Sequence, residues 1–198
     1  MKIDKKKMMV QFGNKKLPKT TMIFNMGSAT NCPSKKLGLC KVCNICYAMK
    51  AEKQYPDCLP YRNRQEAFYA KHDSIDIAKY FIQAIEWKMN SKYPVDAIRF
   101  SEAGDFSNQA MVDKLMVVFS LIKKAFPKIR IYGYTARKDL NFTELMKFAT
   151  VNGSNKMLSN EFKAVDTFTD GNLHCQCNCD TCTLCHVAKG RIIEVLKH

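Results

Sequence analysis

The chain has 198 residues, of which 46% are hydrophobic, and it carries a formal net charge of +14. This length allows one hydrophobic core and is too short for two large domains, so we expect a single domain over residues 1–198. No stretch approaches the roughly 20 apolar residues that cross a bilayer, and Met1–Lys7 lacks the apolar run of a signal peptide, so we expect no membrane association and reduced thiols in a cytoplasm.

The positive charge attracts polyanions and makes nucleic acid a possible partner. Lysines are spread through every segment rather than gathered in one motif, so a merely solvated basic surface is the simpler explanation. Residues 1–20 carry little hydrophobic pattern and include Lys5–Lys7. We expect these residues to form a basic N-terminal arm.

Short apolar runs and helical periodicity alternate along the rest of the chain. The first predicted strand, Thr21–Met26, leads into an early cysteine loop over 31–46. Helices are predicted from Tyr47 to about Tyr55, from about Pro60 to Lys71, from Asp73 or Ser74 to about Met89, from Ser107 to before Pro127, and from Asn141 through Ala149. Further strands are predicted at Asp96–Phe100, Ile129–Tyr134, Lys156–Leu158 and Arg191–Leu196.

This alternation predicts an α/β fold, either a partial (β/α) barrel or an open, mostly parallel sheet with helices, and with cysteine-rich metal loops near both ends. The core is expected over residues 21–160, and a C-terminal cysteine-rich segment over 161–198. Chemistry gathers at the carboxyl ends of parallel strands. We therefore expect the early cysteine loop, Ser101–Phe106 and Thr135–Lys138 to converge on one site.

Two groups of cysteines carry the strongest chemical signal. Each group contains C-x2-C-x2-C, and three thiols at that spacing can wrap one face of a compact iron–sulfur cluster. An upstream cysteine completes each set, either Cys175 or Cys177 in the late group. The predicted ligands of one or two 4Fe–4S clusters are Cys32, Cys40, Cys43, Cys46, Cys175, Cys179, Cys182 and Cys185.

Zinc is the main alternative metal. Structural zinc takes four ligands, usually from two separate C-x2-C pairs, so a zinc site would leave one thiolate over in each group. Disulfide-bonded or unmetallated cysteines also stay open as alternatives. His174 and His186 flank the late group, and we expect them to be neighbours rather than ligands because enough cysteines are present.

Several short motifs follow one another in a specific order. They are Cys46-Tyr47-Ala48 at the end of the early group, an arginine-rich helix with Arg62 and Arg64, Gly104-Asp105-Phe106 after a strand, Tyr134-Thr135 at the end of another strand, and the late group within Cys175–Cys185. From about residue 20 onward, this order resembles a family of small phage and prophage proteins known as gene-product-88-like. The resemblance implies a phage-encoded protein in the cytoplasm of its host.

The arrangement resembles, more loosely, the radical S-adenosylmethionine enzymes, whose partial (β/α) barrels bind a 4Fe–4S cluster after the first strand. The resemblance implies that Glu102 and Asp105 hold the amino group or ribose hydroxyls of S-adenosylmethionine, and that Gly104 and Tyr134 lie in the same cofactor site. Those enzymes use C-x3-C-x2-C and leave one iron open. Here the spacing is C-x2-C-x2-C, and Cys32 could close the open position.

Three classes of function therefore stay open. An open iron predicts an iron–sulfur protein with a radical S-adenosylmethionine-like enzymatic site. Full thiolate ligation predicts a non-catalytic protein, either an electron carrier with an electron donor as partner or a nucleic-acid-binding module stabilised by its cluster. The third class is a zinc-stabilised nucleic-acid binder.

Overall fold

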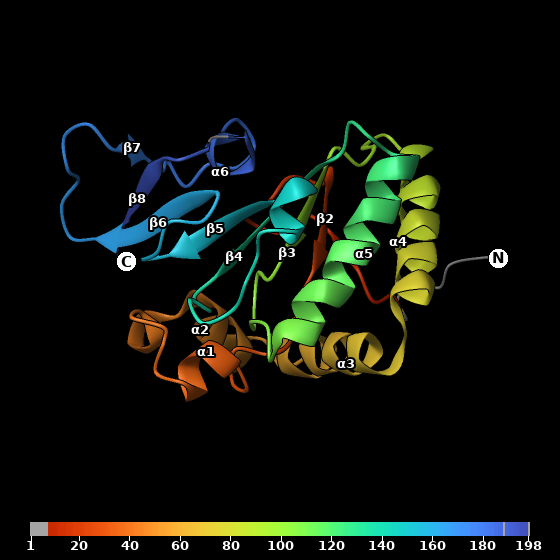
Figure 1. Ribbon diagram of the computed structural model, residues 1–198, viewed down its shortest axis with the longest axis horizontal. Coiled ribbons are helices and arrows are strands. Elements are labelled where there is room, and N and C mark those ends of the chain that lie inside the picture. The colour runs from red at the N-terminus through yellow and green to blue at the C-terminus, as the bar shows by residue number, and fades with distance from the viewer. Residues whose placement is uncertain (1–7, 188, 198) are drawn as a thin grey trace.

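The computed structural model describes residues 8–187 and 189–197, and one eight-stranded sheet runs through this part of the chain (Figure 1). Its strands are β1 Gln11–Phe12, β2 Thr21–Phe24, β3 Ala97–Phe100, β4 Arg130–Thr135, β5 Thr150–Ser154, β6 Asn160–Val165, β7 Leu173–His174 and β8 Ile192–Leu196. The order across the sheet is β1-β2-β3-β4-β5-β6-β8-β7.

The sheet is almost entirely parallel. Only the β1–β2 pair is antiparallel among the described strands. From β1 to β6 the strands follow one another in chain order, as they do in (β/α) barrels, but β1 and β7 remain as edges. These findings confirm the predicted α/β fold as an open, mostly parallel sheet with helices.

Helices and 3-10 turns lie between the strands along the chain. They are α1 Pro33–Lys36, α2 Tyr47–Gln54, α3 Cys58–Lys71, α4 Ser74–Met89, α5 Gln109–Ala125 and α6 Leu184–Val187, with 3-10 turns η2 Cys43–Ile45 and η3 Leu145–Lys147. Asp73 caps α4 by accepting a hydrogen bond from the Asp76 amide. The cap of α5 is Asn108 rather than the predicted Ser107.

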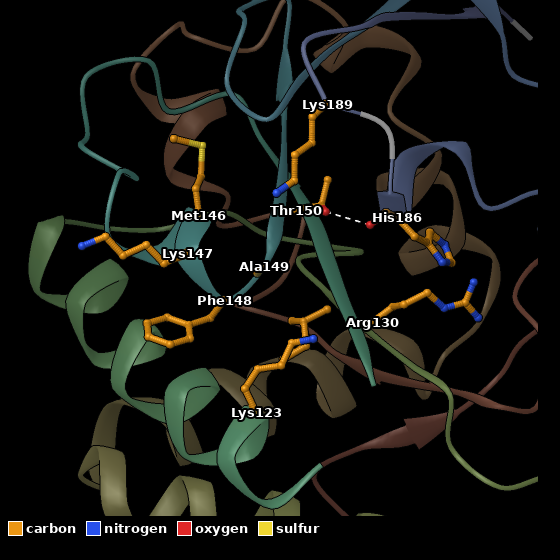
Figure 2. A pocket seen from close by; sticks show the side chains of 10 residues that line it. Lys123, Arg130, Met146, Lys147, Phe148, Ala149, Thr150, His186 and Lys189 are labelled. Carbon is orange, nitrogen blue, oxygen red and sulfur yellow. Dashed lines mark hydrogen bonds between the residues drawn. The ribbon is translucent and has the colours of Figure 1, made fainter. Parts of the chain in front are cut away.

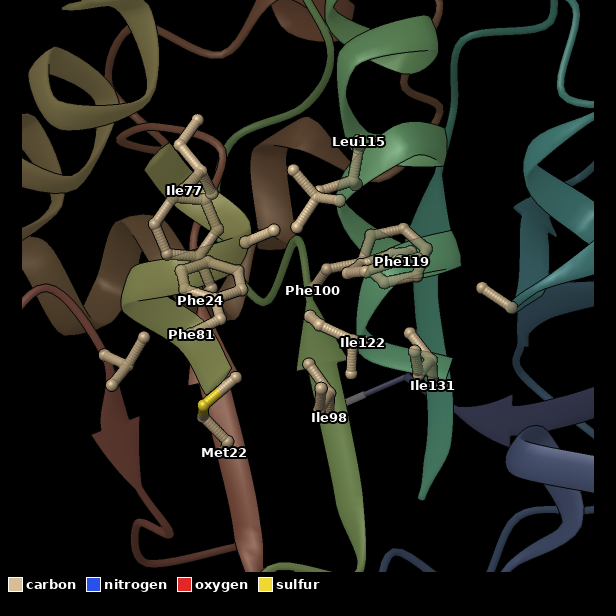
Figure 3. Close-up of a cluster of buried hydrophobic side chains, with 14 of the residues drawn as sticks. Met22, Phe24, Ile77, Phe81, Ile98, Phe100, Leu115, Phe119, Ile122 and Ile131 are labelled. Atoms are coloured by element: carbon tan, nitrogen blue, oxygen red, sulfur yellow. The ribbon is translucent and has the colours of Figure 1, made fainter. Parts of the chain in front are cut away.

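Helices α4 and α5 lie side by side over one face of the sheet (Figure 1). The apolar stripe of each helix packs on β2, β3 and β4, where Phe24, Phe81, Phe100 and Phe119 form the centre of the core (Figure 3). Side chains alternate along a strand, and Ile98 and Phe100 of β3 belong to this core. Arg99, between them, therefore points to the opposite face, which we call the second face.

Residues 8–20 do not form a free arm. Met8 and Val10 are buried in the core, and β1 pairs with β2. The prediction of a basic arm over 1–20 is therefore wrong for residues 8–20, because their apolar side chains have a place in the core. The Lys5–Lys7 run lies outside the described residues.

The helix predicted from Asn141 through Ala149 is also wrong. The segment has only the 3-10 turn η3, followed by strand β5. The Asn141 side chain accepts a hydrogen bond from the Thr143 amide and so makes a local turn. The amides of Lys147 and Phe148 donate to the carbonyls of Glu144 and Leu145, three residues back, so the segment closes as a 3-10 turn just before β5.

The C-terminal cysteine-rich segment is continuous with the same sheet. The strand predicted at Lys156–Leu158 is wrong, because these residues lie in the turn between β5 and β6, which begins at Asn160. β8 confirms the predicted strand at Arg191–Leu196. β8 lies between β6 and β7.

No helix in the described ranges has both the length and the apolar character needed to span a membrane.

Candidate functional site

Asp105 joins the three loops that follow β2, β3 and β4. Its carboxylate accepts hydrogen bonds from the Ser34 hydroxyl at 2.6 Å and the Thr135 hydroxyl at 2.7 Å. The backbone amides of Phe106 and Ala136 also donate to it, each at 2.9 Å. The predicted convergence of these loops is confirmed by these contacts.

The environment of Asp105 indicates a structural role. Its side chain is buried, and burial raises its pKa even though the four donated hydrogen bonds act in the opposite direction. Both carboxylate oxygens already have protein donors. Asp105 therefore positions the loops around the early cysteines, and any contact of this residue with a cofactor would have to replace one of these bonds.

Gly104 allows the loops after β2 and β3 to touch. Its φ is +70°, and a Cβ atom at this position would lie 2.7 Å from the backbone of Gly27. Next to it, the Ala103 amide donates to the Asn25 side chain at 2.8 Å. Glycine is needed here because other residues rarely adopt this φ and any side chain would strike the neighbouring backbone.

A buried ion pair fixes the early cysteine loop from both sides. Glu52 in α2 accepts from the amides of Ala29 and Thr30, just before Cys32, at 2.7 and 2.9 Å. Arg62 in α3 donates to the Glu52 carboxylate and to the Ala48 carbonyl, each at 2.8 Å. Arg62 is therefore a salt-bridge residue on a helix, and it is only 5% exposed.

The four early thiols are neighbours at the carboxyl ends of the strands. All are half-buried. Burial raises the pKa of Cys40 to about 12, and its hydrogen-bonded neighbour Cys43 and the charge of Cys46 act in the same direction. Burial also raises the pKa of Cys32 to about 11, and Cys40 is among the charges that add to this rise. The four early cysteines thus share one loop between β2 and α2.

The late thiols form a second group over the second face. Burial raises the pKa of Cys185, while hydrogen bonding by the Tyr134 hydroxyl and the charge of Arg99 lower it. Burial likewise raises the pKa of Cys175 to about 11, with Cys177 and Cys185 adding to the rise. The Cys175 amide donates a hydrogen bond to the Glu194 carbonyl in β8 at 2.7 Å.

The sulfur atoms do not yet share a metal-binding geometry. All ten cysteines carry free thiols. Among the described residues, no three His, Cys, Asp or Glu side chains stand close enough to hold one ion together. The donor chemistry in both groups fits an iron–sulfur or zinc site, but the loops would have to close further to bring the sulfur atoms to one centre.

The second face carries an arginine that the sequence analysis did not single out. The Arg99 guanidinium lies 3.9 Å from the centre of the Tyr134 ring and 5.4 Å from that of Tyr132. Within the described part of the chain, Arg99 Nε and the Tyr132 hydroxyl are buried without a hydrogen-bond partner. Arg99 could have been singled out from the sequence as a charged residue inside the four-residue strand β3, because central parallel strands are usually apolar throughout.

A cavity of about 550 Å³ lies beside α1. Cys32 is flanked by two residues of its lining, Asn31 and Pro33, and Glu66 and Ser107 lie on other sides of it. This volume is in the range of small-molecule sites. None of the four predicted cofactor-binding residues is among the described residues that line it.

The family described as gene product 88 matches residues 3–153, more than half of the chain. The chain belongs to the gene product 88 family. Neither the search of curated proteins nor the search of solved structures gives a match.

The gene product 88 match confirms the family resemblance and corrects its extent. It begins before residue 20 and includes the early cysteine group, the Glu52–Arg62 ion pair and the loops around Asp105. It ends at residue 153, so the late cysteine group lies outside it. The resemblance to radical S-adenosylmethionine enzymes remains a prediction.

The predicted cofactor-binding residues of this gene product 88 protein lie in two places. Gly104 and Asp105 lie where the three loops meet. Glu102 is half-buried, accepts from the Asn14 side chain at 2.5 Å, and its carbonyl accepts from the Tyr47 hydroxyl at 2.6 Å. Tyr134 points to the second face, toward Arg99 and Cys185.

The gene product 88 protein should lose stability in acid through Glu52. Burial raises the pKa of Glu52, but hydrogen bonds from Ala29, Arg62 and Thr30 outweigh it and hold the pKa below the ordinary 4.5. The unfolded chain therefore takes up this proton first, so the Glu52 contribution is present above pH 4.5 and is lost as the pH falls through the folded-state pKa.

Urea unfolding at pH 7, 5 and 4 measures this contribution. We expect the wild-type free energy of unfolding to fall between pH 5 and 4 by more than that of Glu52→Gln, which cannot titrate at this position. An identical pH dependence in the two proteins would contradict the prediction.

Proposed function

We propose that this protein binds a 4Fe–4S cluster through Cys40, Cys43 and Cys46, and a second cluster through Cys175, Cys179, Cys182 and Cys185. Cys32 is the fourth ligand of the early cluster only in the non-catalytic alternative described below. The observation that carries the proposal is the gathering of the early thiols at the carboxyl ends of the parallel strands. Chemistry is concentrated at this end in such folds.

The electrostatics of the early group support a cationic occupant. Half-buried thiols that raise one another's pKa stay protonated in the absence of a cation, as at Cys40. Iron would stabilise their thiolates, and metal binding would release the protons. Glu52 and Arg62 hold both ends of this loop, so the residues between them can close around a cluster without moving the sheet.

We further propose a radical S-adenosylmethionine-like site beside the early cluster. When bound, a cluster with one open iron supplies an electron to the sulfonium of S-adenosylmethionine. Glu102 would hold the amino group of that cofactor, since its half-exposed carboxylate lies in the loop next to the early cysteines. Gly104 and Asp105 keep this loop in position, and Tyr134 would close the side toward the late group.

A non-catalytic electron carrier is the second candidate function, and the position of Cys32 favours it. Cys32 lies just before α1 in the same loop as Cys40, Cys43 and Cys46, so closure of that loop would bring it to the cluster as a fourth ligand. Four thiolates would leave no iron open for S-adenosylmethionine. The two candidates therefore differ in whether Cys32 binds iron.

Metal analysis of variants tests cluster binding. We expect anaerobically prepared protein to contain iron and acid-labile sulfide in roughly equal amounts. The triple variant Cys40→Ser/Cys43→Ser/Cys46→Ser should lose the early cluster, and Cys179→Ser/Cys182→Ser/Cys185→Ser the late one. Cys58→Ser is the matched control. Cys58 is also half-buried, but it is the first residue of α3 and belongs to neither cysteine group.

The outcomes separate the metals and the sites. Protein that holds zinc without sulfide would overturn the iron–sulfur proposal. A loss of iron in Cys58→Ser as large as in the triple variants would show that the assigned ligands are wrong. If the late triple variant keeps all its iron, the protein holds one cluster and the proposal of a second one fails.

Electron paramagnetic resonance distinguishes the enzyme from the electron carrier. If an iron is open, adding S-adenosylmethionine to the reduced protein should change the spectrum of the early cluster, and Cys32→Ala should respond in the same way. If Cys32 is a ligand, the wild-type spectrum should stay unchanged and Cys32→Ala should alter it before any addition. An unchanged wild-type spectrum would reject the radical S-adenosylmethionine-like site.

A further inference from the structure

A basic cavity of about 190 Å³ opens at the amino ends of β4 and β5, at the end of the sheet opposite the early cysteine loop (Figures 1 and 2). A water molecule occupies about 30 Å³ in the liquid, so a five-atom anion fits with room for part of an attached group. Met146 and Phe148 form an apolar wall. The charged and polar lining residues are Lys123, Arg130, Lys147, Thr150, His186 and Lys189.

Every ionised side chain among the described lining residues is basic. Two of these charges are offset, since Arg130 pairs with Asp96 at 2.6 Å and Lys147 with Glu144 at 2.7 Å. Those carboxylates do not line the cavity. The field inside it is therefore positive and favours an anion.

Two lysines keep their charge available. Lys123 Nζ donates to the Ile129 carbonyl at 2.6 Å and to the Pro127 carbonyl at 3.4 Å. An ammonium group has three donors, so one remains for a ligand. Lys189 is exposed. In the part of the chain that the structure describes, no carboxylate pairs with either lysine, and Figure 2 shows their side chains extending toward the cavity from different elements.

His186 adds an unsatisfied polar group to the wall. It is only 6% exposed and its ring stacks on Tyr132 with the ring centres 3.6 Å apart. Neither ring nitrogen has a hydrogen-bond partner within the described structure. Because both nitrogens are covered, the His186 ring shapes the wall without offering a donor to a ligand.

We propose that this cavity binds the phosphate group of a small molecule. Lys123 and Lys189 contact the phosphate oxygens, and Met146 and Phe148 face the organic part of the ligand. None of the residues that contact the phosphate is a proposed cluster ligand.

Calorimetric titration of the full chain at about 0.15 M salt tests the site, with inorganic phosphate, adenosine monophosphate and adenosine as probes. We expect both phosphate compounds to bind and adenosine not to bind. Lys189→Gln should weaken phosphate binding roughly tenfold, because it removes one charge-assisted hydrogen bond. Tighter binding of adenosine monophosphate than of phosphate would identify a ligand with an organic part, and equal binding would identify free phosphate.

The matched control is Lys124→Gln, which removes the same charge from an exposed residue next to Lys123 on α5. It should change phosphate affinity by less than about twofold, because salt screens exposed charges. An equal loss in both variants would overturn the proposal in favour of a diffuse basic surface. The absence of phosphate binding would overturn it too, as would Lys189-dependent displacement of phosphate by an oligonucleotide without a terminal phosphate, which would indicate a nucleic-acid surface.

Discussion

Arg62→Ala is expected to lower the free energy of unfolding by about 3–5 kcal/mol, because it leaves a carboxylate buried without its cation. The side chain of Glu52 is only 2% exposed, and its oxygen lies 2.8 Å from Arg62 Nη1. The substitution also removes a donor from the Ala48 carbonyl. Urea denaturation followed by circular dichroism at pH 7 measures the loss.

Two further variants isolate the ion pair. Arg64→Ala changes the same residue type on the same helix, but Arg64 is exposed and lies over the Tyr61 ring at 5.6 Å, so its loss should stay below about 1 kcal/mol. The double variant Glu52→Gln/Arg62→Met should be more stable than Arg62→Ala, because no unpaired charge is left buried. Equal destabilisation by Arg62→Ala and Arg64→Ala would contradict the buried ion pair.

Gly104→Ala should be the second strongly destabilising change, at about 2–5 kcal/mol. A positive φ costs a residue with a Cβ roughly 1–2 kcal/mol, and overpacking adds about 1–3 kcal/mol. The second contribution arises because the new Cβ would lie 2.7 Å from the Gly27 backbone, which cannot move as a flexible side chain can. The free energy of unfolding from urea titrations gives this value.

Gly38→Ala is the matched control for Gly104→Ala. Gly38 has nearly the same φ, +67°, and no atom lies within 4 Å of a Cβ built there. It should therefore show only the conformational part, about 1–2 kcal/mol. If both variants lowered the free energy of unfolding equally, the close contact between the loops after β2 and β3 would add nothing to the cost of Gly104→Ala.

The long helices and central strands were accessible from the sequence because their signals are local. The helical spacing of α4 and α5 and the short apolar runs of β3 and β4 depend on neighbouring residues alone. Their alternation then predicts a parallel sheet, and parallel strands bring their carboxyl ends together. This is why the convergence of the loops around Asp105 could be predicted before the structure.

Segments whose structure depends on distant partners could not be predicted in the same way. The Asn141–Glu144 pattern resembles a helix start, yet only the 3-10 turn η3 follows it before β5 begins at Thr150. A strand takes its hydrogen bonds from its neighbours in the sheet, so residues 150–154 follow the free edge of β4 rather than their own pattern. Met8 and Val10 are buried for a similar reason, since the core that accepts them is built by α4 and β2.

Part of the candidate site could be predicted from the sequence, and the rest depends on the tertiary structure. By itself, the sequence determined which thiols form each group, because C-x2-C-x2-C places them close together in any fold. Only the tertiary structure decided that Arg62 is buried against Glu52, that Arg99 lies with Tyr134 near the late thiols, and that lysines far apart in the chain surround one cavity. Charged side chains acquire such roles from burial and from partners, and both are properties of the packed chain.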